Sequence, residues 1–236
     1  MAETLAKSID KNKDSSGFQL KRSRDPQSQI WRDAIPVEYE VFKQSGYVED
    51  SDEIEHTYAP YETESTMYSL YKEEIAVGEI RIIDYDPIVG FKTLDDIENG
   101  ILEVDENGRG LLDELDLTKT FEVGTIGLDE NFRTTPEEEF HPIMQLYGMI
   151  YTYGHDNNLP NIIASFDEKY LGRFAGMYGS ALTYLGPAKK MMGSPTIPVL
   201  IDLNRMQESF KAMGTEAFEA FEGNLFAIGH SVESDD

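Results

Sequence analysis

One strand-like segment in the middle of the chain, residues 120–128, most constrains what the protein can fold into. It reads TFEVGTIGL, and its apolar side chains predict a strand. An acidic side chain, Glu122, lies between two apolar ones, and Gly124 and Gly127 interrupt the run. Glycine inside a strand often marks a bulge or a point where a ligand approaches the backbone. A carboxylate beside freed backbone N–H groups suits acyl transfer, because it can accept a proton from an amine while they hold a carbonyl oxygen.

The hydrophobic pattern on both sides of this segment predicts a mixed α/β domain. β-Branched or alternating runs indicate strands, and apolar residues at helical spacing indicate helices. The expected strands are 65–71 and 75–83, joined by a hairpin at 72–74, and 161–166, 181–185 and 196–203. The expected helices are 35–46, one after a capping box at 135–138 that includes 143–150, one that begins after Asp167, and 206–221. A long acidic excursion, 84–118, holds a short helix near 111–115. This order of elements favours one mixed sheet with helices against it.

Composition divides the chain of 236 residues into three parts. Residues 1–30 are polar and lack periodicity, so we expect a flexible N-terminal arm. Residues 31–205 are long enough for one sizeable domain, and 206–236 are expected to form a helix followed by an acidic tail.

The balance of charge limits the partners of the chain. It has 45 acidic and 20 basic residues, a net charge of -25 and a pI of about 4.4. Such a chain repels phosphates, so no nucleic-acid partner is expected, and the charge serves solubility or an acidic recognition surface. Cysteine is absent, and the four histidines lack metal-ligand spacing, which predicts no metal site. No apolar run has the length of a membrane span or signal peptide, so we expect a cytoplasmic protein.

Four segments together resemble the acyl-homoserine-lactone synthase and long-chain N-acyl amino acid synthase branch of the GCN5-related N-acyltransferase superfamily. They are YEVFKQSGY at 39–47, AVGEIR at 76–81, the strand that contains Glu122, and Asp167 with Arg173, LGP at 185–187 and PVLID at 198–202. The resemblance runs from about Val37 to Leu203. It implies the fold of that superfamily, an α/β fold with a mixed central sheet flanked by helices.

The resemblance also implies an activity. A medium or long acyl chain would move from an acyl carrier protein, or from coenzyme A, to the amine of an amino acid or related small molecule. Glu122 would help to deprotonate the amine, and Arg81 would close a strand of the form Val-Gly-x-x-Arg. No bound cofactor is implied, since the acyl donor is a substrate.

Physical reasoning leaves several roles open for these residues. A bulge formed by Gly124, Thr125 and Ile126 would supply a backbone N–H to the oxyanion. Arg81 would bind an acceptor carboxylate or hold Glu122 in place. The structural alternative is that Glu122 only pairs with a cation such as Arg81.

The chain departs from the family pattern at two places. The family has Ser-Arg after the Glu-Val of this strand, whereas this chain has Gly124-Thr125, and the upstream Asp-x-x-Asp pair is replaced by YETE at 61–64. These changes indicate either a compensated change of acceptor or lost activity. A catalytically inactive binding protein with this fold is therefore the main alternative.

The region after Arg133 bears on the donor. Acetyl-CoA-dependent members carry a glycine-rich loop that binds pyrophosphate, but here the sequence is TTPEEE at 134–139. Three carboxylates would repel a pyrophosphate, which favours a donor tethered to a carrier protein. A CoA-dependent N-acetyltransferase with an atypical loop remains the third possibility.

Four cations are candidates for docking an acidic carrier protein. Lys169 and Arg173 are one helical turn apart, and Lys189 and Lys190 follow a Gly-Pro turn. In so acidic a chain they would form a local basic patch. The alternative is that they are unrelated surface charges.

Overall fold

The structure, a computed structural model, describes residues 17–132, 142–212 and 233–234. Its strands are β1 (Phe18–Ser23), β2 (Ser65–Lys72), β3 (Ile75–Asp84), β4 (Thr120–Leu128), β5 (Asn161–Asp167), β6 (Leu182–Tyr184), β7 (Lys189–Met191), β8 (Ser194–Asp202) and β9 (Glu233–Ser234). Its α-helices are α2 (Gln29–Gln44), α3 (Ser51–Tyr58), α4 (Lys92–Glu98), α5 (Glu106–Glu114), α6 (Pro142–Asp156), α7 (Glu168–Tyr178) and α8 (Leu203–Ala212), and the 3₁₀ helix η1 (Ala59–Glu64) follows α3.

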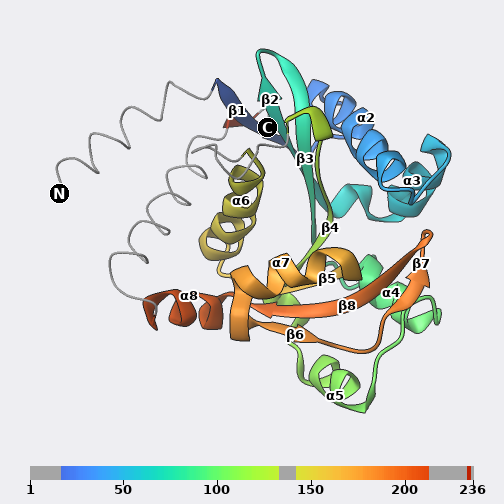
Figure 1. Cartoon of the computed structure of the whole chain (residues 1–236), viewed down its shortest axis with the longest axis vertical. Coiled ribbons are helices and arrows are strands. Elements are labelled where there is room, and N and C mark those ends of the chain that lie inside the picture. Colours follow the sequence, from blue (N-terminus) through green and yellow to red (C-terminus); the bar gives the residue numbers. More distant parts are fainter. Residues whose placement is uncertain (1–16, 133–141, 213–232, 235–236) are drawn as a thin grey trace.

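The described strands form one mixed sheet, as the sequence predicts. Its order is β6-β8-β5-β4-β3-β2-β1-β9, and β7 pairs with β8. The β4–β5 and β1–β9 pairs are parallel and the other pairs are antiparallel. β4 pairs with β5 only over 120–123, although it continues along β3 to Leu128. The sheet therefore opens beyond Val123 into two halves joined by β4 (Figure 1).

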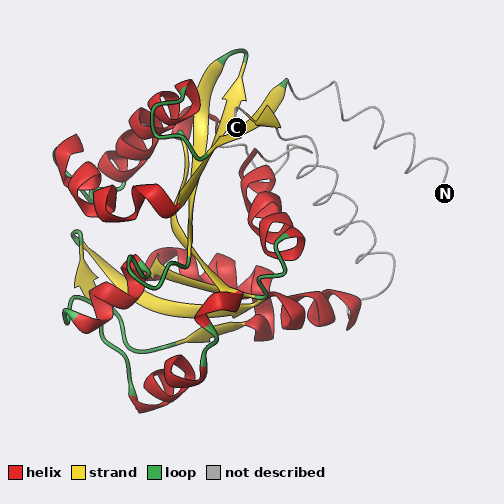
Figure 2. Cartoon of the chain, turned by 180° about the vertical axis from the view of Figure 1, so that it is seen from behind, coloured by secondary structure: helices red, strands yellow, loops and turns green. Residues whose placement is uncertain are grey.

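Helices cover both faces of the sheet (Figure 2). α2 and α3 lie on one side of β2–β4, and α6 lies on the other (Figure 1). The main core forms between α6 and the sheet, where Leu146 and Ile150 join Ile80, Ile82 and Phe121 in one buried cluster. No helix within the described ranges is long and apolar enough to cross a bilayer.

α2 begins six residues before the helix start expected at Ile35, because Ser28 caps it. The Ser28 hydroxyl accepts a hydrogen bond of 3.3 Å from the Trp31 backbone N–H. The buried Trp31 indole donates to the Ser23 carbonyl at 2.9 Å and fixes the first turn against β1. Pro36 lies inside the helix, where it removes one hydrogen bond.

The expectation of a flexible arm through residue 30 is wrong for residues 18–30. Residues 18–23 form β1, which pairs along its own full length with residues 67–72 of β2 and buries Leu20. The Lys21 ammonium lies 5.0 Å from the centre of the Tyr71 ring. β1 gains its stability from this partner strand, so its own sequence, with few apolar residues, gives little sign of it.

Several other expectations lie partly outside the described residues. The capping box at 135–138 lies outside them, and α6 is described from Pro142 onward. The expected C-terminal helix is described as α8, which starts at Leu203 rather than 206 and is described to Ala212. Within the acidic excursion 84–118, the short helix expected near 111–115 is α5, and α4 precedes it.

The hairpin expected between β2 and β3 is confirmed. Lys72 pairs with Ile75, which leaves Glu73 and Glu74 as the two turn residues, with φ of 50° and 69°. Two successive positive φ values are typical of a type I′ turn, which favours Asn-Gly because other residues are strained there. Two neighbouring glutamates in this conformation therefore store strain.

Replacing both turn residues, Glu73→Asn with Glu74→Gly, should stabilise the protein. We expect the free energy of unfolding to rise by about 1 kcal/mol, because the strain of two left-handed residues is relieved. Urea unfolding followed by circular dichroism measures the change. A matched control, Glu73→Gln with Glu74→Gln, removes the charge but keeps the strain, so an equal gain in this control would assign the effect to charge and contradict the explanation.

Candidate active site

Glu122 lies in β4 opposite Ile83 of β3, and its side chain is almost fully enclosed, with 1% exposed. One carboxyl oxygen, Oε1, accepts two hydrogen bonds from Thr93 in the first turn of α4. The backbone N–H donates at 3.0 Å and the hydroxyl at 2.6 Å. The other oxygen, Oε2, is buried and has no hydrogen-bond partner among the described residues. Thr93 thus holds one oxygen and leaves the other free to accept a proton.

Burial raises the pKa of Glu122 to about 7. The hydrogen bonds from Thr93 and the charge of Lys92 act in the opposite direction, and the charge of Asp96 adds to the rise. The desolvation of the charged carboxylate outweighs its partners. A carboxyl group that is half ionised near neutral pH and has a free oxygen is well suited to general base catalysis.

β4 carries a bulge beside Glu122. Arg81 pairs with Thr125 and Ile82 pairs with Val123, so Gly124 has no partner on β3. The bulge falls within the predicted segment 124–126 and centres on its first residue. The Gly124 carbonyl accepts a hydrogen bond of 2.7 Å from the Tyr58 hydroxyl, and a Cβ at Gly124 would lie 3.1 Å from the Tyr58 ring. Glycine therefore lets Tyr58 pack against the bulged backbone. That Gly124, Thr125 or Ile126 binds an oxyanion stays a prediction.

Arg81 forms its ion pair with Glu38 of α2 rather than with Glu122. Its Nη2 lies 2.9 Å from Glu38 Oε2, and its Nε donates to Glu38 Oε1 at 3.2 Å. The guanidinium carbon lies 5.1 Å from the Trp31 ring centre and 4.8 Å from that of Tyr58. The alternative in which Glu122 pairs with Arg81 is therefore wrong, and Arg81 joins α2 to β3.

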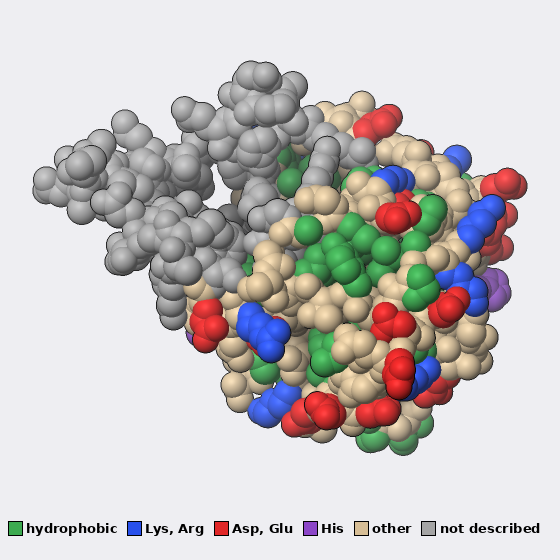
Figure 3. All heavy atoms as spheres, turned by 60° about the horizontal axis from the view of Figure 1, so that its bottom comes forward, with side chains coloured by type: hydrophobic (Ala, Val, Ile, Leu, Met, Phe, Trp, Pro, Cys, Tyr) green, Lys and Arg blue, Asp and Glu red, His purple; other side chains and the backbone are tan. Residues whose placement is uncertain are grey.

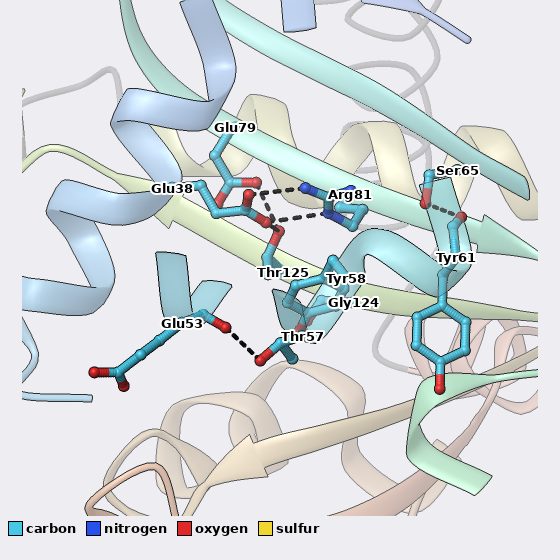
Figure 4. A network of polar contacts seen from close by, with 10 residues as sticks. All are labelled: Glu38, Glu53, Thr57, Tyr58, Tyr61, Ser65, Glu79, Arg81, Gly124 and Thr125. Carbon is cyan, nitrogen blue, oxygen red and sulfur yellow. Dashed lines mark hydrogen bonds and ion pairs between the residues drawn. The ribbon is translucent and has the colours of Figure 1, made fainter. Parts of the chain in front are cut away.

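Thr125 lies between two glutamates (Figure 4). Its hydroxyl oxygen is 2.7 Å from Glu38 Oε1 and 2.8 Å from Glu79 Oε2. A hydroxyl group has one proton and can donate it to only one of these oxygens. Because Glu38 forms the ion pair with Arg81, we infer that Thr125 donates to Glu38 and that a protonated Glu79 donates to Thr125.

The surroundings of Glu79 support this arrangement. Glu79 is fully buried, and burial followed by the charge of Glu38 raises its pKa to about 8. The hydrogen-bond contact with Thr125 and the charge of Arg81 oppose the rise. Arg81 thus forms an ion pair with Glu38 but not with Glu79, and Glu79 keeps its proton at neutral pH. A protonated Glu79 adds no second negative charge beside Thr125.

Sequence reasoning missed Glu38, Glu79, Tyr58 and Thr93. For Glu38 there is a signal, because Ala34, Glu38 and Val41 follow one another at helical spacing and lie on the buried face of α2. An acid on an apolar helix face needs a buried cation. Thr93 offers no comparable signal, since it lies in the acidic excursion and meets Glu122 only through tertiary packing.

A narrow apolar cavity lies where β4 and β5 diverge. Its volume is about 10 Å³, room for about one water molecule. The lining comes from β4, α6, β5 and β8: Val123, Ile126, Tyr147, Ile150, Ile162, Phe166 and Ile201. An acyl chain at this point would require these side chains to move apart.

The cations expected to form a docking patch are brought together only in part. Thr196 of β8 pairs with Asp167 on one side and with Lys189 on the other, so their backbones are about 10 Å apart. Lys169 lies 3.0 Å from Asp167 Oδ2, and Lys189 donates to the Gly100 carbonyl.

The remaining cations add little to this patch. Lys190 is exposed, whereas the side chain of Arg173 lies outside the described residues. On the face shown in Figure 3, basic side chains stand among acidic ones rather than in one basic field. Carrier docking therefore stays a prediction.

Solved structures share this architecture. FeeM, an N-acyl amino acid synthase from uncultured soil microbes, is 18% identical with a TM-score of 0.57, over 81% of this chain and 93% of FeeM. BjaI, a CoA-dependent acyl-homoserine lactone synthase, is 12% identical with a TM-score of 0.58, over 93% of this chain and 94% of BjaI. The AHL synthase LasI is 13% identical with a TM-score of 0.53, over 87% of this chain and 94% of LasI.

The chain has the GCN5-related N-acyltransferase fold. This confirms the expected fold and the structural likeness to the synthase branch. Neither a family model nor a curated protein sequence matches the chain.

Replacing Glu79 with Gln should make the protein less sensitive to alkaline pH. Glu79 binds its proton more tightly in the folded chain than in the unfolded one. The stabilisation is complete below about pH 4.5 and is lost as the pH rises through about 8. Between pH 6 and pH 9 the wild type should lose on the order of 2 kcal/mol more stability than Glu79→Gln.

Urea unfolding at the two pH values measures this difference. Glu40→Gln is the matched control, because Glu40 is an exposed glutamate on α2, and it should follow the wild type. Parallel pH profiles for the wild type and Glu79→Gln would show that Glu79 is ionised in the folded protein at both values.

Proposed function

We propose that the protein is an N-acyltransferase that moves a medium or long acyl chain from a thioester to the amine of a small molecule. The neutral amine nitrogen attacks the thioester carbonyl carbon, a C–N bond forms and the C–S bond breaks. Glu122 accepts the proton that the nitrogen loses and passes it to the departing sulfur. The products are an amide and a free thiol, and the carboxylate is restored.

The environment of Glu122 is the observation that carries this proposal. Its Oε2 is buried without a partner while Thr93 holds Oε1, and its pKa of about 7 makes it an effective base near neutral pH. The bulge at Gly124, on the same strand, is a candidate source of a backbone N–H for the tetrahedral oxyanion. The fold shared with FeeM, BjaI and LasI supports acyl transfer as the reaction class.

The split between β4 and β5 is the proposed place for the acyl chain. Its lining is apolar, with Tyr147, Ile150 and Phe166 as side chains that can rotate to admit a chain. We propose an acyl carrier protein as the donor, with acyl-CoA as the alternative. The carboxylates at 137–139 support this order, because they disfavour a pyrophosphate.

Glu122→Gln should abolish product formation while the fold survives, because the amide is similar in size but cannot take a proton. We expect a loss of at least about 100-fold, the usual size of a general base contribution. The variant and the wild type are expressed in a bacterium, and lipid extracts are searched for new N-acyl products by mass spectrometry.

Glu73→Gln, an exposed glutamate in the β2–β3 turn, is the matched control and should keep wild-type product levels. Full turnover by purified, folded Glu122→Gln would rule out Glu122 as the base. An extract without product from well-folded wild type would favour a binding protein.

A further inference from the structure

Carboxylates dominate the surroundings of Glu122. Asp95 and Asp96 lie on α4, the helix that supplies Thr93. The Tyr61 hydroxyl donates to Asp95 Oδ2 at 2.5 Å. Burial, the hydrogen bond to Asp95 and the charges of Asp95, Glu122 and Asp96 together raise the pKa of Tyr61. These three acids therefore act on one small region, and Glu122 Oε2 is a buried, unpartnered atom within it.

The cations of this region are already engaged. The Lys92 ammonium is paired with Asp96 at 2.5 Å and is largely buried. Arg81 is bound by Glu38, is 1% exposed and lies between two aromatic rings. The Lys92 ammonium lies 5.6 Å from the centre of the same Tyr58 ring. Lys92 cannot bind a second carboxylate without giving up Asp96. Arg81 has one nitrogen, Nη1, without a hydrogen-bond partner among the described residues, but this atom is buried and the charge of Arg81 is already balanced by Glu38.

The bulged part of β4 offers no other cation that could bind an acceptor carboxylate. Thr125 is neutral, and its hydroxyl group is hydrogen-bonded to Glu38 and Glu79. An acceptor with a carboxylate next to its amine would bring a negative charge towards Asp95, Asp96 and Glu122. Such repulsion is strong in a region from which water is excluded. An acceptor without that carboxylate brings only an amine, which the acids attract as an ammonium ion.

We propose that the acceptor is a primary amine that lacks a carboxylate beside its nitrogen, rather than an amino acid. This inference rests on the proposed acyl transfer and selects its substrate class. The bond changes are those of that reaction. The acceptor nitrogen gains the acyl carbon, the thiol leaves, and Glu122 carries the proton from nitrogen to sulfur. An ammonium ion first loses one further proton to the solvent.

Three acceptors that differ stepwise test the proposal. Tyramine lacks the carboxylate, tyrosine carries it, and tyrosinamide has a neutral group of similar size in its place. Purified protein receives each with lauroyl carrier protein and, separately, with lauroyl-CoA, and the N-lauroyl product is measured by mass spectrometry. Rates are compared per concentration of neutral amine, because the three amines differ in pKa.

We expect kcat/KM for tyramine and tyrosinamide to exceed that for tyrosine by about tenfold or more, since only tyrosine adds a charge. A kcat/KM for tyrosine equal to or above that for tyramine would overturn the inference, although the proposed acyl transfer would still hold. Tyrosinamide as slow as tyrosine would also overturn it, because exclusion would then depend on size. Failure of all three with folded protein and both donors would overturn the acyl transfer as well.

One variant tests the role of charge directly. Asp95→Asn removes a negative charge and keeps an oxygen that can accept from Tyr61. We expect the preference for tyramine over tyrosine to fall by about threefold or more. Glu98→Gln removes an equal charge from an exposed position on the same helix and should leave the preference unchanged, because solvent screens that charge. An unchanged preference in Asp95→Asn would contradict the proposal.

Discussion

The buried ion pair between Glu38 and Arg81 is the interaction on which the rest of the site depends. Moving two charges out of water is costly, and a buried pair persists only when its geometry and remaining hydrogen bonds are satisfied. Here two Arg81 nitrogens meet the Glu38 carboxylate, Thr125 adds a third donor, and aromatic rings cover the guanidinium. The third nitrogen of Arg81, Nη1, has no hydrogen-bond partner among the described residues. The pair fixes α2 against β3 and β4, and so fixes the strand that carries Glu122.

The same environment affects three buried glutamates differently. Glu38 forms an ion pair with Arg81. Glu79 is protonated because it is buried next to the charge of Glu38 and has no cation of its own. The pKa of Glu122 is raised less than that of Glu79, because the hydrogen bonds from Thr93 and the charge of Lys92 oppose the effect of burial. Pairs of titratable groups with diverging pKa values are a frequent mark of acid–base chemistry, which is why Glu122 is the favoured base.

Local patterns predicted the parts of the fold that depend on local sequence. The strand with Glu122, its glycine-marked bulge and the turn at Glu73 and Glu74 could all be predicted from residue types and their spacing. β1 could not, because it is stabilised by pairing with β2 rather than by its own apolar pattern. The contact of Thr93 with Glu122 joins residues 29 positions apart and depends on how the excursion folds back, which no short-range pattern encodes.

The ionisation of Glu122 tests the account most directly. In protein with ¹³C-labelled glutamate, the Glu122 carboxyl resonance is assigned as the signal that Glu122→Gln removes, and it is then followed by NMR across the pH range. Burial without a partner at Oε2 predicts a midpoint near pH 7. A midpoint at the ordinary glutamate value of about 4.3 would show that Glu122 is solvated or paired with a cation, and would contradict its assignment as the base.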